Sequence, residues 1–283
     1  TNLGDFAYGT ALLAFYVPLD TPILSQETEI NYANNGMDSL IKIVKYAYND
    51  KKQIKEVNTQ MNDNNTWYSK RFSYPTDFTH SVVYRNMVDI NMINSLIQSE
   101  QVMIDSNGNI SNILKEKYNY DQLTDENGVV RPIISNYQST KGNAALQTHV
   151  IYDYYDKKGN PLHITIDEKE EIIYLWGYNY QYIVAEIKNA TMMQVKNIIG
   201  NIDDFEKASV PNSTKLNQLR AQLKEAQVRV FEFDPLIGKI RETDAKGVDI
   251  HFEYDLQGRL MHTKDYLGNM LEKYLHHYSK RNK

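Results

Sequence analysis

The chain contains no cysteine among its 283 residues. Disulfide bonds, thiolate metal sites and a thiol nucleophile are therefore excluded. The absence does not argue against an extracellular location, because many large surface proteins fold without disulfides.

Long apolar runs are missing as well. No stretch of about 18 apolar residues occurs, so we expect no transmembrane segment in this chain. Residues 1–5 lack the basic region that opens a secretory signal peptide. Because the chain begins without methionine and ends within a repeating pattern, we expect it to be a piece of a longer protein.

An excess of positive charge is also absent. The chain has 31 Lys and Arg against 36 Asp and Glu, a net charge of -5. Nothing in this balance indicates a nucleic-acid partner. The residue type in excess is tyrosine, since 22 Tyr outnumber 8 Phe and 2 Trp together. A tyrosine ring with a hydrated hydroxyl suits the half-buried face of a β-strand.

A repeat of 20 to 21 residues dominates the second half of the chain. Asp234 and Asp255 are 21 residues apart, and Tyr155 and Trp176 have the same spacing. Self-similarity at a fixed period indicates a repeated supersecondary unit.

Each unit consists of an aromatic residue, an Asp, two or three further residues, a Gly and an alternating strand, which predicts a β-hairpin. An Asp that opens a turn accepts hydrogen bonds from the turn backbone, and Gly supplies positive φ. Aromatic residues two positions apart share one face and stack on the next hairpin. The repeat-defining positions are Tyr155, Asp156, Gly159, Asp234, Gly238, Tyr254, Asp255, Gly258, Asp265, Gly268 and Tyr274.

The first half predicts a meander of strands with less regular spacing. A hairpin turn is expected at Asn35-Gly36, because Asn-Gly favours the two positive φ values of a type I′ turn. Pro75 ends a strand, and residues 79–90 favour a short helix. The expected strands of this part cover residues 23–30, 39–48, 53–60, 67–74, 96–104 and 144–155.

One segment changes from strand period to helix period. Asn189 is placed to cap a helix that ends at Gly200, and Asn212 or Ser213 is placed to cap a second one. Each helix has a single apolar stripe, so both should lie on the surface of a sheet. We therefore expect a two-helix insertion over residues 189–227.

These motifs resemble the Rhs/YD-repeat family, whose units begin with Tyr-Asp. The match is best over residues 252–260 and 152–161, and it extends over residues 150–278 and, more loosely, 20–90. The resemblance implies an antiparallel sheet of hairpins that is exported from a bacterial cell. In relatives such sheets form a shell around a C-terminal toxin, or they serve in adhesion and cell contact.

The sequence and the resemblance together predict a mainly β fold, with repeated antiparallel β-hairpins in an extended, curved or spiralling sheet. Residues 1–283 would form a single array. Segments 174–180 and 184–191 are similar to the form found in surface or secreted proteins of the Bacteroidetes. The closing segment at which toxin-bearing members cleave themselves is absent. The family is known mainly for scaffolding and supplies no catalytic residue, so we expect no enzyme.

Metal and catalytic motifs are sparse. The histidines show no His-x-x-x-His spacing, and His276 and His277 point to opposite faces of one strand, so no metal or cofactor is expected. Residues 105–109 offer alternating oxygen ligands for calcium but lack the downstream Glu of an EF-hand. A glycosidase needs paired carboxylates, yet the recurring aspartates keep register with the turns. They are Asp156, Asp167, Asp234, Asp244, Asp255 and Asp265.

The densest aromatic clusters allow two interpretations. If exposed, Trp67, Trp176, Tyr178 and Tyr180 would stack on sugar rings or anchor a protein partner. If packed, they would form cross-strand ladders inside the hairpin array, which is the interpretation we favour.

The sequence thus favours a structural scaffold segment of an extracellular or cell-surface bacterial protein that encloses or presents another module. Its partners would be other parts of its own polypeptide. The alternative is an adhesion module that binds a carbohydrate or a surface protein through exposed aromatics. A hydrolase with paired Asp is the third interpretation.

Overall fold

The structure is a computed structural model that describes residues 22–32, 39–61, 65–125 and 127–276. Its sixteen strands form one sheet in which every strand pairs with its neighbours in the sequence, from β1 to β16. The predicted mainly β fold of antiparallel hairpins is confirmed. The expected Asn35-Gly36 turn and His277 lie outside the described residues.

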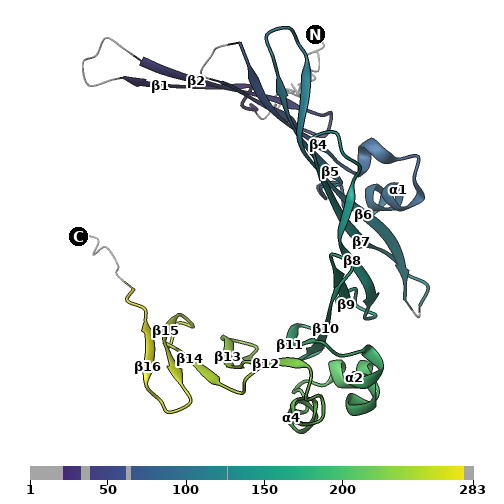
Figure 1. Ribbon diagram of the computed structural model, residues 1–283, viewed down its shortest axis with the longest axis vertical. Helices are drawn as coiled ribbons and strands as arrows, with labels where there is room; N and C mark the ends of the chain where they lie inside the picture. The colour runs from purple at the N-terminus through teal and green to yellow at the C-terminus, as the bar shows by residue number, and fades with distance from the viewer. Residues whose placement is uncertain (1–21, 33–38, 62–64, 126, 277–283) are drawn as a thin grey trace, which may run out of the picture.

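The sheet bends into an open arc, with β1 near one end and β16 near the other (Figure 1). The strands expected over residues 39–48 and 53–60 occur as β2 and β3. The first nine strands are β1 (Gln26–Tyr32), β2 (Ser39–Tyr48), β3 (Ile54–Gln60), β4 (Trp67–Ser73), β5 (Gln98–Ile104), β6 (Ile110–Thr124), β7 (Val130–Lys141), β8 (Gln147–Tyr155) and β9 (Pro161–Ile166). The others are β10 (Glu170–Gly177), β11 (Tyr182–Lys188), β12 (Gln227–Asp234), β13 (Gly238–Thr243), β14 (Asp249–Tyr254), β15 (Leu260–Asp265) and β16 (Met270–Lys273).

Extra residues inside the strands are a physical source of the curvature. Most strand pairs contain a register shift at which one strand carries an unpaired residue. On β13 this residue is Ile240, because Glu232 pairs with Arg241 while Phe233 pairs with Lys239. A bulge of this kind bends its strand and increases the local twist. Repeated from hairpin to hairpin, it turns a flat ladder into an arc.

Two helical elements lie on the outer side of the arc (Figure 1). In the first half, the 3-10 helix η1 (Pro75–Phe78) leads into α1 (Val82–Asp89), which lies within the short helix expected over residues 79–90. The side chain of Met87 is fully buried, and the ring of Tyr84 meets Tyr120 of β6 edge to face.

The second element is the insertion between β11 and β12, which has three helices and not the expected two. They are α2 (Met192–Ile199), α3 (Ile202–Lys207) and α4 (Ser213–Gln222). The side chain of Asn201 accepts a hydrogen bond from Asp204 N and so starts α3 directly after Gly200. The expected cap at Asn189 is wrong, because Thr191 caps α2 and bonds reciprocally with Gln194.

The insertion covers the main hydrophobic core of the described chain. Side chains from β10, β11 and β12 pack against the apolar stripes of the three helices, and each fully buried one contributes about 1.5–3 kcal/mol by leaving water. Its members include Ile173, Leu175, Val184, Ile187, Val195, Ile199, Phe205, Leu216, Leu219, Val228 and Val230. Among the described residues, no helix is long and apolar enough to cross a membrane.

Candidate functional site

Five of the six recurring aspartates accept hydrogen bonds from their own turns, whereas the carboxylate of Asp167 contacts His149 at 2.9 Å. Asp255 shows the pattern: one carboxylate oxygen accepts hydrogen bonds from Gln257 N (2.9 Å) and Arg259 N (3.0 Å). The other oxygen accepts from Arg259 Nε (2.6 Å), and this bond is the main reason why the pKa of Asp255 falls to about 2. Gly258 completes the turn with a φ of 73°, which favours glycine.

The same arrangement recurs along the array. Asp156 and Asp265 each accept two backbone N–H groups and a side-chain amide, and Asp234 accepts from Leu236 N. Gly159, Gly238 and Gly268 all have positive φ. With their oxygens engaged in turns, these aspartates do not provide the free carboxylate pair that a glycosidase requires.

Two of the three repeat tyrosines, Tyr155 and Tyr254, link neighbouring strands through their hydroxyl groups. The Tyr155 hydroxyl donates to Ile134 O, and its ring stacks on Tyr152 at a centroid distance of 6.1 Å. The Tyr254 hydroxyl donates to Lys239 O (2.7 Å). Tyr274 donates to Glu272 within its own strand region and stays exposed.

The aromatic cluster after β10 forms a tight turn that holds the insertion. Tyr178, Asn179 and Tyr180 have φ values of 52°, 58° and 64°, a run of left-handed residues that is costly outside glycine. Tyr178 and Tyr180 are 9% and 8% exposed. The Tyr178 hydroxyl accepts a hydrogen bond from Phe233 N, and the indole of Trp176 donates to Pro161 O. The rings of Tyr178 and Tyr180 are therefore largely packed, whereas Trp176 is half-buried.

Trp67 has a different environment. It is half-buried, and Lys45 Nζ lies 4.9 Å from its ring centre. It lines a pocket of about 420 Å³ together with Glu56, Asn58 and Arg71. Trp67 and Trp176 are both half-buried, and Trp67 borders this pocket beside polar groups.

A buried carboxylate, Glu206 of α3, was not identified from the sequence. It is 1% exposed, and burial raises its pKa from 4.5 to about 8, with Asp156 and Asp203 contributing. Its carboxylate oxygen accepts from Trp176 N at 3.2 Å. Glu206 lies four residues after the buried Ile202, so its position on the apolar stripe was the available signal.

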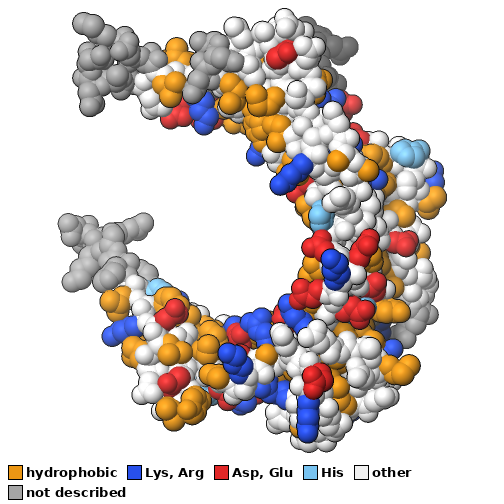
Figure 2. All heavy atoms as spheres, in the orientation of Figure 1, with side chains coloured by type: hydrophobic (Ala, Val, Ile, Leu, Met, Phe, Trp, Pro, Cys, Tyr) orange, Lys and Arg blue, Asp and Glu red, His pale blue; other side chains and the backbone are white. Residues whose placement is uncertain are grey.

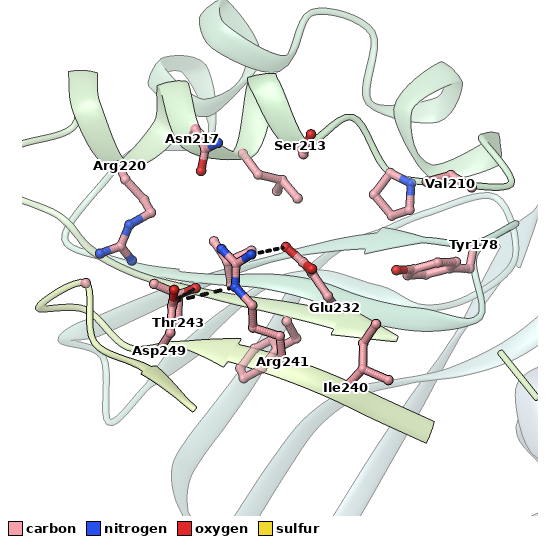
Figure 3. Close-up of a pocket in the computed structure, with 15 residues that line it drawn as sticks. Tyr178, Val210, Ser213, Asn217, Arg220, Glu232, Ile240, Arg241, Thr243 and Asp249 are labelled. Atoms are coloured by element: carbon pink, nitrogen blue, oxygen red, sulfur yellow. Dashed lines mark hydrogen bonds and ion pairs between the residues drawn. The ribbon is translucent and has the colours of Figure 1, made fainter. Parts of the chain in front are cut away.

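A polar pocket beside the insertion lies between α4 and strands β12 to β14, with a volume of about 530 Å³ (Figure 3). Arg241 points into its centre, 3.4 Å from Glu232 and 3.6 Å from Asp249. Arg220 of α4 donates to Val228 O and Asp244 O, and this fixes the helix to the sheet. The lining contains Ser213 but no histidine. Its charges balance, and the arrangement serves as a joint between the insertion and the repeats.

The opposite face of the same strands carries paired charges. Side chains alternate across a strand, so the neighbours of the helix-covered residues face the inside of the arc. There Arg229 contacts Glu242 (2.6 Å) and Glu186 (3.4 Å), and Lys239 contacts Glu242 (2.5 Å). Lys239 also lies 4.4 Å from the ring centre of Phe252. Lys, Arg, Asp and Glu are intermixed along the inner rim (Figure 2).

Within the described ranges, no group of three or more His, Asp or Glu side chains is arranged to hold a metal ion. His163 contacts carboxylates without forming such a group: it lies between Asp153 (3.3 Å) and Glu171 (3.4 Å), and its ring stacks on Tyr154.

No protein-family model and no curated protein sequence matches the chain. Similar solved structures include crystal structures of TcdB2-TccC3 with Cdc42 and of TcdB2-TccC3 without its hypervariable C-terminal region. Their identity is 10% and their TM-scores are 0.40 and 0.38. The Photorhabdus luminescens Tc holotoxin pore has 9% identity and a TM-score of 0.36. The matches cover 88 to 89% of this chain but 11 to 12% of those chains. At this similarity they carry no argument about function.

Proposed function

We propose that this chain is a non-enzymatic structural segment of an exported bacterial protein, one stretch of a curved wall that encloses or presents another module of its own polypeptide. The observation that carries the proposal is the single sheet of consecutive hairpins bent into an open arc (Figure 1). A wall needs continuous backbone pairing and uniform curvature, and the repeated turns and bulges supply both.

The sheet edges support a role inside a larger assembly. Among the described strands, β1 and β16 each pair on one side alone. An edge strand presents unpaired N–H and C=O groups, which proteins normally cover. β16 is exposed along its whole length. Further hairpins of the same polypeptide are the simplest cover, because the unit repeats with a fixed geometry.

The inner face suits enclosure better than tight binding. Its acidic and basic side chains are paired with one another, as at Arg229, Glu242 and Lys239. Paired surface charges offer little net attraction to a partner. The family resemblance at residues 252–260 and 152–161 supports the same role and an extracellular or cell-surface location, and the Bacteroidetes type stays a prediction from the sequence.

Photo-crosslinking in the full-length polypeptide tests the proposal. We replace Tyr174, which faces away from the helices in β10, with p-benzoylphenylalanine. As a matched control we replace Met193, an exposed residue on the outer helix α2. We expect intramolecular crosslinks from position 174 to a segment outside the array, with few from position 193. Equal crosslinking from both positions would argue against a wall with an enclosed module.

Trp67 favours a second function, carbohydrate or protein adhesion. Its half-buried ring borders the 420 Å³ pocket together with the polar residues Asn58 and Arg71. Such a pairing of a ring and a polar group suits a sugar. Glycan-array binding that is lost in Trp67→Ala and kept in Lys224→Gln would support adhesion. If the unmodified chain binds no glycan on the array, carbohydrate adhesion is contradicted and the scaffold role is the proposal that stands.

A further inference from the structure

Four cationic side chains from three separate segments converge on one small pocket. Arg131 comes from β7, Lys157 and Lys158 from the β8–β9 turn, and Lys207 from the end of α3. The pocket has a volume of about 250 Å³, and Asp125 is the one carboxylate among the described residues that line it. The described lining of this pocket thus has a net positive charge, although the whole chain has a net charge of -5.

Hydrogen bonds fix the frame of this basic pocket. Arg131 contacts Asp125 at 3.2 Å and donates to Lys157 O at 3.4 Å, which ties the β6–β7 turn to the β8–β9 turn. Asp125 also accepts from Asn127 N and Val129 N. Its carboxylate is therefore bonded to its own turn and to Arg131, and it shares the pocket lining with the lysines.

Tyr180 forms one wall of the basic pocket. The ammonium groups of Lys157 and Lys158 each lie 5.9 Å from its ring centre. Its hydroxyl donates to Asp203 at 2.6 Å, and Asp203 pairs with Lys157 at 2.8 Å. The Tyr180 backbone is left-handed and is held in place by a bond from its N–H to Glu206 O. A backbone kept in this costly conformation by its surroundings is a common feature of binding sites.

Two of the cations have capacity for a ligand. Within the described ranges, the ammonium groups of Lys158 and Lys207 form no hydrogen bond and no ion pair. Converging ammonium and guanidinium groups bind phosphate and sulfate oxygens through charge-assisted hydrogen bonds. We propose that the pocket between Arg131, Lys158 and Lys207 binds a tetrahedral oxyanion, a phosphate or sulfate group that is either free or an ester on a polysaccharide. This inference does not depend on the scaffold role.

Titration calorimetry with sodium sulfate and sodium phosphate, at constant ionic strength in chloride, tests the site. The double variant Lys158→Gln/Lys207→Gln should bind both anions roughly tenfold more weakly, since two charge-assisted bonds are lost. The control Lys51→Gln/Lys224→Gln changes the net charge equally at exposed positions outside the pocket and should bind as the unmodified chain does. Circular dichroism confirms that each variant is folded.

A sulfated oligosaccharide separates the two sources of the anion. Tighter binding than inorganic sulfate, with the same loss in the double variant, would assign the site to an esterified polysaccharide. Equal affinity would assign it to the free anion. The proposal is overturned if the unmodified chain shows no heat of binding beyond that of chloride, or if the two double variants weaken binding equally.

Discussion

Two regions of the same sheet differ in whether helices cover it. The first is β10 to β12 with the helical insertion, and the second is the hairpins of β13 to β16. In the first region Ile173, Leu175 and Ile187 are fully buried under helices. In the second, the described strands bury no apolar side chain, and their buried residues are Thr243 and Thr263. The first region is two layers with a core, and the second is a single layer.

This difference indicates that the turns determine the shape of the sheet, whereas the hydrophobic core provides most of its stability. The Asp and Gly turns recur in both regions, so turn chemistry alone produces hairpins. A hairpin layer without a core is marginal in water. The C-terminal hairpins expose many hydrophobic side chains (Figure 2), with Leu236 and Leu256 almost fully exposed at turn tips. We infer that the insertion anchors the array and that the hairpins depend on their neighbours.

The largest expected effect is a cavity under the insertion. Leu219→Ala in α4 removes a fully buried side chain and should lower the free energy of unfolding by about 2–5 kcal/mol. Ile240→Ala in β13, where the side chain is 37% exposed, should cost roughly 1 kcal/mol or less. Urea unfolding followed by circular dichroism measures both. Similar losses for the two variants would contradict the division into two regions.

The next effect depends on pH and acts through Glu206. Its pKa is about 8 in the folded chain against an ordinary 4.5, so the folded state binds more protons between these values. The contribution of Glu206 to stability should therefore be largest below pH 4.5, fall as the pH rises through this window, and level off above pH 8. We expect a loss of about 2–4 kcal/mol from this group, after allowing for relaxation around the charge.

Glu206→Gln provides the control for that pH dependence. The amide oxygen of Gln can still accept the hydrogen bond from Trp176 N, but it does not ionise. The variant should be more stable than the unmodified chain at pH 8 and nearly equal to it at pH 4.5. Thermal unfolding at a series of pH values measures this. An unchanged pH profile in the variant would show that Glu206 does not titrate in this range.

A smaller effect is expected at the cap of α2. Thr191→Ala removes the side chain that accepts from Gln194 N, and loss of such a cap costs about 1 kcal/mol. Because α2 covers the core, the loss should appear in global unfolding by urea. Thr191→Ser keeps the hydroxyl and should restore most of the stability. If the Ser variant is as unstable as the Ala variant, the methyl contact and not the cap is responsible.

The smallest effect is local and lies in the single-layer region. Asp255→Ala removes the acceptor for Gln257 N and Arg259 N. The amides of this turn should exchange with solvent roughly threefold to tenfold faster, with little change in global unfolding. Hydrogen exchange followed by mass spectrometry measures this. Asp255→Asn keeps one oxygen acceptor and should be intermediate.

Local patterns in the sequence predicted the strands and the turn chemistry well. The alternation over residues 39–48 corresponds to β2, and the 21-residue spacing of Asp234 and Asp255 marks every second turn, between β12 and β13 and between β14 and β15. These features depend on neighbouring residues alone. The third helix was missed, because the cap at Asn201 follows directly on the end of α2 and reads as a continuation.

Features that depend on contacts between distant segments could not be predicted. The bulge at Ile240 needs the register of β12 against β13, which one strand does not reveal. In the pocket between α4 and strands β12 to β14, Arg241 lies beside Glu232 and Asp249. Strand pairing brings these three residues together. The basic pocket joins β7 to α3, two elements about 75 residues apart in the sequence, through Arg131 and Lys207.

The most direct test of the difference in stability between the helix-covered strands and the single-layer hairpins is hydrogen exchange along the whole chain. It is measured peptide by peptide at neutral pH. We predict that amides of β10, β11 and β12 exchange slowest, through global unfolding. Those of β14 to β16 should exchange at least about a hundredfold faster through local opening, since no core closes over them. Protection of β14 to β16 equal to that of β10 to β12 would contradict the conclusion that the insertion anchors the array.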